Sequence, residues 1–343
     1  MSVNLEHSPE YGVDLCVMSG AVSVDETINA FAGADEKANW LVVFSENVDL
    51  SGVDVARFSA MRRAFNEGEP RGDELRLSAL VNLSEPNELF VRFWAHYASA
   101  GAPRSRMRRM FSTFEAACQW LGLPSAASPA LAAAAAEMVE AKAETGSGEA
   151  ETAEDRRKII KAASGLFRTR GFEALTVAEI MDAAGVAREA FEACFESKDD
   201  LIVHALVDAL SDLPVPEKTW AKFTAAYLSP RHRDNIAGGC ALAALASDSI
   251  RQSPAARTAM TVALNWQIER LSRNAPGGDA AARRRAAVRA WSAMVGAMIL
   301  ARASKDQELA QEVLDETHSW ITDPSVAAVG AAGSSSPEIQ PRP

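Results

Sequence analysis

The sequence predicts two domains, a small α/β domain followed by an all-helical domain. Short apolar runs rich in β-branched residues alternate with helical patterns up to about residue 124. From Glu154 to Asp323 only helical periodicity occurs. A length of 343 residues fits two domains. We therefore expect an α/β domain over 1–124, a linker over 125–152 and a helical part over 153–323.

The composition limits the classes of partner. With 48% hydrophobic and 24% charged residues, the chain has the composition of a soluble globular protein. The 35 Lys and Arg residues stand against 46 Asp and Glu residues, a net charge of −11. Nucleic-acid binding therefore requires a local basic face. The N-terminus is acidic and polar, and no apolar run approaches the roughly 18 residues of a membrane span. We expect a cytoplasmic protein with no membrane partner.

The four cysteines and the other reactive residue types form no site. The cysteines lie far apart, without metal-ligand spacing, which is typical of reduced thiols. The five histidines are scattered, and the sequence contains no GxSxG, P-loop, HExxH or GxGxxG motif. We therefore expect no cofactor, no metal and no enzymatic activity.

The elements of the N-terminal domain follow in order along the chain. The expected strands are VDLCVM from Val13, WLVVF from Trp40, RLSALVNL from Arg76 and RMRRMFST from Arg106. The expected helices are VDETINAFAG, VDVARFSAMRRAF, ELFVRFWAHYASAG and FEAACQWLG. This alternation predicts a small sheet with helices packed on it.

Two segments have the composition of unstructured chain. In the segment 125–152, SAASPALAAAAAE can form a short Ala-rich helix, but GSGEAET has no apolar face to bury. We predict a linker over the whole segment. The tail over 324–343, which includes AAGSSSPEIQPRP, is predicted to be disordered.

A helix-turn-helix follows the linker. Ile159 and Phe167 lie on one face of a first helix, which Gly171 ends. Thr176 is a good N-cap for a short second helix, because Glu179 three residues later completes a capping box. Gly185 supplies the tight turn, and the expected recognition helix runs over 188–194.

This stretch resembles the DNA-binding domain of the TetR/AcrR family of transcriptional regulators. The resemblance rests on GF-x-x-x-T-V-x-x-I-x-x-x-A-G-V, from Gly171, followed by F-x-S-K-x-x-L, from Phe195. It implies a DNA-binding domain over 153–202 and an all-helical ligand-binding and dimerisation domain over 203–323. It also implies a homodimeric regulator, most simply a repressor, that binds a double-stranded DNA operator and releases it when a small-molecule effector binds.

The resemblance places the DNA contacts on named residues. Phosphate contacts are expected from Thr176, Lys198 and the basic first helix with Arg156, Arg157 and Lys161, and base contacts from Arg188, Glu189 and Glu192. The glutamates depart from the family, whose members usually carry an aromatic residue at the position of Glu192. A glutamate repels phosphate, yet it can accept a hydrogen bond from cytosine N4. Two hypotheses remain open: the helix reads DNA, or the chain is a dimeric protein-interaction module with weak or lost DNA binding.

The helices after 203 would enclose the effector. Candidate pocket residues are Phe223, Leu242, Leu245, Met260, Trp266 and Trp291, although core packing explains each of them equally well. Cys240 follows two glycines at the start of an apolar helix, where a thiol pKa can be lowered, or it is simply a small buried residue. Apolar stripes on the helix over 280–303 and on the next one, up to Trp320, predict the dimer interface.

The N-terminal part has a weaker resemblance of its own. LSALVNLSEPNELFVRFWAHYASAGAPRSRMRRMFSTFEAACQWLGL is similar to the closing half of SpoIIAA-like or STAS-type domains, and YGVDLCVMSGAVSVDETINAF to their opening. The similarity covers about 3–123 and implies a module that binds a partner protein.

Overall fold

The computed structural model describes residues 2–32, 34, 38–50, 53, 76–84, 87–99, 106–140, 148–211 and 219–323. The chain forms two compact units. The first consists of Met1–Ser164, Phe172–Ser211 and Gln252–Val262, and the second of Gly165–Gly171, Asp212–Arg251 and Ala263–Pro343. The first unit contains an α/β part and most of the helix-turn-helix, and the second contains most of the remaining helices.

The α/β part is built on a five-stranded sheet in the order β1-β2-β3-β4-β5. β1 pairs antiparallel with β2, and β2, β3, β4 and β5 pair parallel to one another. The strands are β1 (Val3–Ser8), β2 (Val13–Met18), β3 (Asn39–Phe44), β4 (Arg76–Asn82) and β5 (Arg106–Phe111). All four predicted strands are confirmed. β1 was not predicted, because VNLEHS is an edge strand with mostly half-buried or exposed positions and lacks an apolar run.

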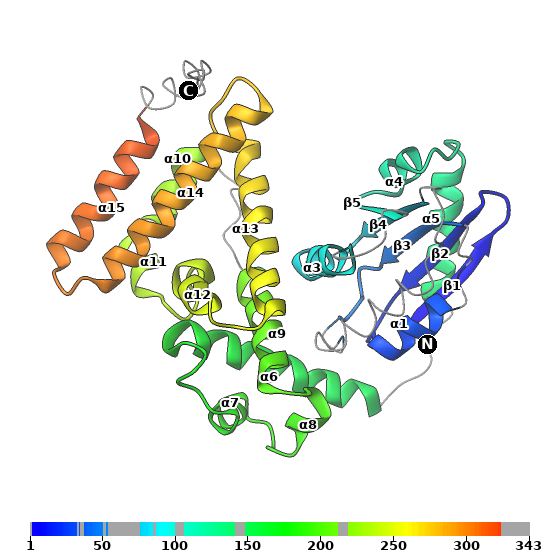
Figure 1. Ribbon diagram of the computed structural model, residues 1–343, viewed down its shortest axis with the longest axis horizontal. Helices are drawn as coiled ribbons and strands as arrows, with labels where there is room; N and C mark the ends of the chain where they lie inside the picture. The colour runs from blue at the N-terminus through cyan, green and yellow to red at the C-terminus, as the bar shows by residue number, and fades with distance from the viewer. Residues whose placement is uncertain are drawn as a thin grey trace, which may run out of the picture. The chain divides into compact units, whose positions relative to one another are not determined.

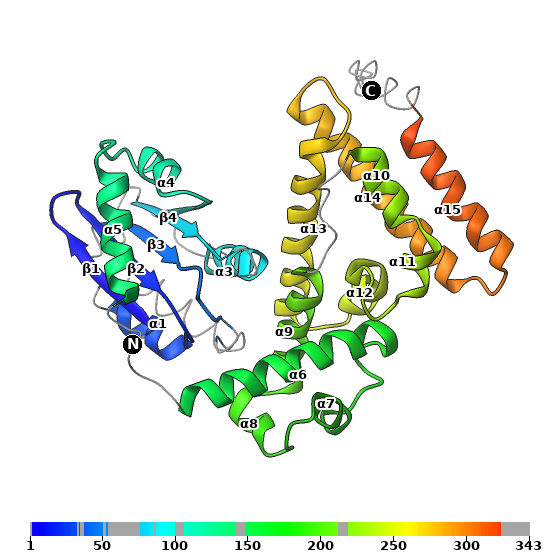
Figure 2. The same cartoon turned by 180° about the vertical axis from the view of Figure 1, so that it is seen from behind.

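Helices cover both faces of the sheet (Figure 1). α1 (Val24–Ala32) and α3 (Glu88–Ser99) lie on one face, and α4 (Phe114–Trp120) and α5 (Ala127–Glu140) lie on the other (Figure 2). α1 follows β2 and α3 follows β4, so each occupies a crossover between parallel neighbours. The predicted helix VDVARFSAMRRAF falls outside the described residues.

The structure moves the end of the α/β part beyond residue 124. α5 occupies the first half of the predicted linker and buries Ala127, Leu131, Ala135 and Met138 in one core with β2, β3, β4 and α4. Its buried residues recur every three or four positions, which gives even an alanine-rich helix an apolar face. This face was missed because alanine alone scarcely distinguishes a core helix from a linker.

The helix-turn-helix consists of α6 (Gly148–Arg170), α7 (Val177–Ala184) and α8 (Ala190–Cys194), followed by α9 (Lys198–Ser211). α6 already begins within the predicted linker. The predicted boundary between 202 and 203 also falls inside a helix, because α9 continues without interruption to Ser211. Nearly every residue of α9 is buried, so the helix belongs to a core along its whole length.

The remaining elements are all helical. They are α10 (Trp220–Tyr227), α11 (Pro230–Asp234), α12 (Ala241–Ser249), α13 (Pro254–Asn274), α14 (Ala280–Ala303) and α15 (Gln307–Thr322). Over 148–211 and 219–323 the described chain contains no strand, as predicted. The predicted disordered tail over 324–343 lies outside the described residues.

α14 is long and apolar and pairs with α15 (Figure 1). Among the described helices it alone has the length and composition of a membrane span, with a mean hydropathy of 1.2 over its most apolar window. The core helix of a soluble protein meets the same criteria. Trp291, Met294 and Met298 are buried on one face of α14, and 39% of that window is buried.

Candidate functional site

The N-terminus of α7 is fixed by a reciprocal cap. The Thr176 hydroxyl accepts a hydrogen bond from the backbone N–H of Glu179 (3.3 Å), and the Glu179 carboxylate accepts one from the N–H of Thr176 (2.9 Å). The predicted capping box is therefore confirmed. The Thr176 hydroxyl also donates to the Glu179 carboxylate (2.8 Å), so this carboxylate compensates the partial positive charge of the helix N-terminus.

The turn between α7 and α8 depends on Gly185. Its backbone has φ 67° and ψ 31°, the left-handed conformation that glycine adopts without strain. The N–H of Val186 then donates to the carbonyl of Met181 (3.2 Å), which ends α7. The sequence located this turn correctly.

α8 is shorter than the predicted recognition helix. It begins at Ala190, so Arg188 and Glu189 lie in the turn that precedes it. Arg188, Glu189 and Glu192 are all exposed. The Arg188 guanidinium lies 3.4 Å from the Asp182 carboxylate, so the one cation of this surface is partly neutralised by α7.

Arg156 occupies a different place from the one expected. Its side chain is only 6% exposed, and its guanidinium stacks over the ring of Phe195 at 4.2 Å. It also donates to Nε2 of His204 (2.9 Å) and lies 4.0 Å from Asp200. We therefore exclude Arg156 from the phosphate-binding set, because its guanidinium joins α6 to the end of α8 and to α9 instead.

The contact with Arg156 determines the protonation state of His204. Because arginine has only donors, Nε2 of His204 must accept and therefore carries no proton. Burial, and then the nearby charge of Arg156, hold the pKa of His204 well below its usual value. The imidazole is thus neutral around pH 7.

The other predicted phosphate contacts differ in accessibility. Arg157 and Lys161 are exposed on α6, and each lies near an acidic side chain, Glu154 at 3.1 Å and Asp208 at 3.6 Å. The ammonium of Lys198 instead donates to the backbone carbonyl of Phe172 (2.8 Å). Lys198 therefore closes the loop before α7, a role that the sequence did not reveal.

Residues 159–205 match the family model of the bacterial regulatory proteins of the tetR family. Residues 159–205 form a TetR-type helix-turn-helix. This match agrees with the capped α7, the glycine turn and the exposed α8 described above. No curated protein matches the chain.

Several solved structures resemble the chain. The reduced form of E. coli NemR is 19% identical, with a TM-score of 0.41, over 49% of this chain and 95% of that one. A TetR-family regulator from Cytophaga hutchinsonii is 17% identical, with a TM-score of 0.42, over 50% and 94%. FadR from Bacillus subtilis, in complex with stearoyl-CoA, is 21% identical, with a TM-score of 0.34, over 48% and 97%.

Beyond the TetR-type domain, three of the predicted pocket residues gather around Tyr227. Its ring packs at 5.1 Å against Trp291 and at 6.3 Å against Phe223, measured between centroids. The Cys240 thiol and the Tyr227 hydroxyl influence each other electrostatically, and the charge of Arg302 acts on both groups. Tyr227 and Arg302 were not predicted, because a lone tyrosine and a lone arginine carry no motif.

His232 holds this cluster together. Its Nε2 accepts from the backbone N–H of Cys240 (2.9 Å), and its Nδ1 lies 2.7 Å from the carbonyl of Tyr227, so the proton sits on Nδ1. Burial lowers the pKa of His232. Gly239 must be glycine here, because a Cβ would overlap the carbonyl oxygen of Asn235 and approach the Arg302 guanidinium to 2.6 Å.

Cys240 is a buried thiol rather than an activated one. Burial raises its pKa, and this effect outweighs the hydrogen bonds and the Arg302 charge, which lower it. Among the other candidates, Leu242 and Leu245 are buried on α12, Met260 is half-buried, and Trp266 carries the Arg270 guanidinium over its ring at 4.3 Å. Each of these positions is one that core packing explains.

Proposed function

We propose that the protein is a homodimeric, DNA-binding transcriptional regulator, acting as a repressor. The observation that carries this proposal is the TetR-type helix-turn-helix over 159–205, with its capped α7 and its exposed α8. The chemistry of DNA recognition needs both phosphate contacts and base contacts. The described residues offer both.

The phosphate contacts come from two elements. At the exposed N-terminus of α7, a phosphate oxygen would replace the Glu179 carboxylate as the acceptor of the Thr176 hydroxyl. Arg157 and Lys161 on α6 are 57% and 64% exposed and can exchange their acidic neighbours for phosphate. Surface ion pairs of this kind are worth roughly 0–1 kcal/mol, so the exchange costs little.

The base contacts come from the turn before α8 and from its first residues. Arg188 suits guanine, and Glu189 or Glu192 can accept a hydrogen bond from the N4 amino group of cytosine. From these guanine and cytosine contacts we expect each half-site of the operator to be rich in G·C pairs. The glutamates repel any phosphate nearby, so they favour a pose in which α8 lies deep in the major groove.

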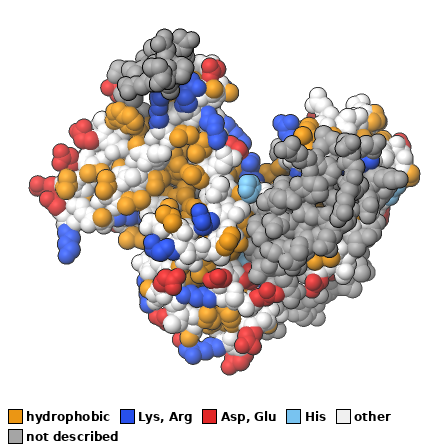
Figure 3. Space-filling model, viewed as in Figure 1, with side chains coloured by type: hydrophobic (Ala, Val, Ile, Leu, Met, Phe, Trp, Pro, Cys, Tyr) orange, Lys and Arg blue, Asp and Glu red, His pale blue; other side chains and the backbone are white. Residues whose placement is uncertain are grey.

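Dimerisation follows from the apolar surface of α14 and α15. Hydrophobic side chains gather on the face that carries these helices (Figure 3). The exposed large apolar residues on the pair are Val288, Ile299, Leu300, Leu309 and Trp320. Val288 and Ile299 are three helical turns apart on α14, as a continuous stripe requires. A two-fold interface of two helices from each protomer would cover them.

Effector binding is proposed for the side chains around Tyr227. Aromatic walls with a few polar groups are the usual lining of a small-molecule site, and Phe223, Trp291, Cys240 and Arg302 supply both. DNA half-sites are spaced by roughly 34–36 Å, so an effector that changes the separation of the two α8 helices releases the operator.

A second candidate function is a protein-interaction module that has lost DNA reading. The observation in its favour is the charge around α8, where Asp182, Glu189, Glu192 and Glu196 are exposed beside the single, paired Arg188. In that case the α/β part, with its SpoIIAA-like or STAS-type resemblance, would bind the partner.

The two functions are distinguished by the binding of the full chain to fragments of its own upstream DNA. We compare the unaltered protein with Arg188→Ala and with Arg251→Ala, an exposed arginine on the second unit that also has an acidic neighbour. The regulator hypothesis expects a sequence-specific complex that Arg188→Ala weakens about tenfold or more and Arg251→Ala leaves unchanged. The absence of any specific complex, or an equal effect of the two substitutions, would favour the interaction module.

A further inference from the structure

The α/β part contains a cavity on the face of the sheet that carries α1 and α3. Leu41 and Val43 of β3 belong to the core cluster with α4 and α5. Since side chains alternate along a strand, Trp40, Val42 and Phe44 face the opposite way. They line the cavity together with Ser78 and Leu80 of β4 and residues of β2, β5, α1 and α3.

Two aromatic pairs form the walls of this cavity. At one end, Phe31 of α1 packs against Trp40, with ring centroids 4.8 Å apart. At the other end, Trp94 of α3 packs edge-on against Phe44 at 5.6 Å. Flat, rigid rings on both sides leave a space that suits another planar group.

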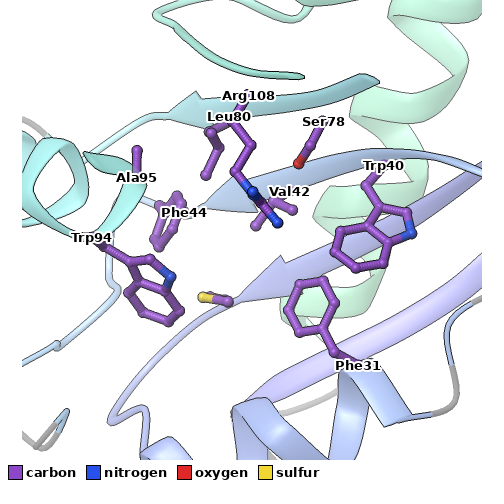
Figure 4. Close-up of a pocket in the computed structure, with 10 residues that line it drawn as sticks. Phe31, Trp40, Val42, Phe44, Ser78, Leu80, Trp94, Ala95 and Arg108 are labelled. Atoms are coloured by element: carbon purple, nitrogen blue, oxygen red, sulfur yellow. The ribbon is translucent and has the colours of Figure 1, made fainter. Parts of the chain in front are cut away.

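An arginine enters the space between these walls. Arg108 of β5 is half-buried, and its side chain runs toward Val42, so that its guanidinium lies between the Phe31–Trp40 pair and the Phe44–Trp94 pair (Figure 4). Ser78, whose side chain also lines the cavity, is only 2% exposed. The lining of the cavity is therefore largely apolar, with one permanent cation and one hydroxyl group.

The size of the cavity limits what it can hold. It spans about 400 Å³, including the part open to solvent. This volume lies toward the lower end of the range for small-molecule sites, roughly 300–1,000 Å³. A single small ring therefore suits the space better than a nucleotide or a long acyl chain.

We propose that this cavity binds a small aromatic carboxylate. The ring would lie between the two aromatic pairs, and the carboxylate would pair with the Arg108 guanidinium, whose two parallel N–H groups match its geometry. The apolar surroundings strengthen that pairing, because the local dielectric is lower than that of water. The inference concerns the α/β part alone and does not depend on whether α8 binds DNA.

Calorimetric titration of the full chain with benzoate and with benzamide tests the proposal. The two probes have the same ring, but only benzoate carries a charge. We expect benzoate to bind at least about tenfold more tightly, because a hydrogen-bonded pair of opposite charges is stronger than a neutral hydrogen bond. Arg108→Gln should abolish this preference. Arg109→Gln, on the exposed side of the same strand, should leave it intact.

Three results would overturn the proposal. They are the absence of heat from either probe at millimolar concentration, equal affinities for the two probes in the unaltered protein, and an unchanged preference in Arg108→Gln. If circular dichroism shows that Arg108→Gln is unfolded, Ala95→Leu replaces it, because a larger side chain on α3 fills the cavity. Retained benzoate binding in a folded Ala95→Leu protein would also contradict the site.

Discussion

At the scale of single residues, the proposed base contact of Arg188 would compete with an ion pair. The guanidinium of Arg188 lies 3.4 Å from the Asp182 carboxylate and could not bind this carboxylate and a base fully at the same time. The sequence identified Arg188 as a DNA contact, but it could not show that Asp182, six positions earlier, reaches the same guanidinium. The turn at Gly185 creates that proximity.

Asp182→Asn should therefore strengthen binding to the operator. It removes a competing partner and one negative charge from the DNA-facing surface. An exposed ion pair contributes about 0.2–1 kcal/mol, so we expect an increase of about two- to fivefold in affinity. Fluorescence anisotropy with a labelled operator measures the change, and Asp248→Asn, which breaks the Arg251–Asp248 pair of the second unit, is the control. Weaker binding by Asp182→Asn would show that Arg188 depends on Asp182 for its position.

His204 should make the stability of the protein depend on pH. In the folded chain its pKa is held well below the usual value by burial and by Arg156, whereas in the unfolded chain it takes up a proton near pH 6.5. The unfolded state thus binds more protons, and the free energy of unfolding falls as the pH drops below about 6.5.

His204→Gln should reduce this dependence, since its amide oxygen can still accept from Arg156. Between pH 6.5 and pH 5, we expect the free energy of unfolding of the variant to change less steeply with pH than that of the unaltered protein, by up to about 1.4 kcal/mol per pH unit. Urea denaturation at several pH values provides the measurement, with His96→Gln on the exposed side of α3 as the control. If His204→Gln has the same slope as the unaltered protein, groups other than His204 cause the loss of stability at low pH.

At the scale of elements, the strongest departure from the sequence-based prediction is α5. The strands at Val13, Trp40 and Arg76 were predictable, because central parallel strands carry apolar runs. The edge strand at Arg106 alternates basic and apolar residues, which also indicates a strand. For α5, a short Ala-rich helix was allowed by the sequence but its place in the core was not predicted, because Leu131 and Met138 are the only large residues among its buried positions. Arg156 shows the same limit for a single side chain, since a basic cluster in the sequence does not reveal which member turns inward.

The boundary of the α/β part can be tested with two fragments. The fragment 1–140 retains α5, and the fragment 1–124 exposes the sheet core that Leu131, Ala135 and Met138 cover. We expect the longer fragment to show a cooperative thermal transition by circular dichroism and the shorter one to aggregate. Cooperative unfolding of both fragments at the same temperature would show that α5 contributes nothing to the core.

At the scale of the whole molecule, the proposed regulator requires a dimer. The stripe on α14 and α15 exposes five large apolar side chains, and Leu300 is the most exposed of them at 62%. Scattered apolar residues are ordinary on a surface, but a stripe that runs along two paired helices is typical of an interface.

Leu300→Glu should shift the protein from dimer to monomer. A charge in the middle of an apolar interface is desolvated without a partner, which costs several kcal/mol. Analytical ultracentrifugation at micromolar concentration gives the mass, and Ile250→Glu, at an equally exposed apolar position away from the stripe, is the control. A dimer that persists in Leu300→Glu would place the interface elsewhere.

The salt dependence of operator binding is the first measurement to make, because it shows whether the TetR-type helix-turn-helix binds DNA through phosphate contacts. Each Lys or Arg side chain that contacts a phosphate, as proposed for Arg157 and Lys161, releases counterions from the DNA. With about three such contacts per protomer, a dimer should give a slope near −5 for the logarithm of the association constant against that of the salt concentration. Arg157→Ala combined with Lys161→Ala should make the slope shallower. A slope near zero, or no complex with any upstream fragment at low salt, would contradict the account.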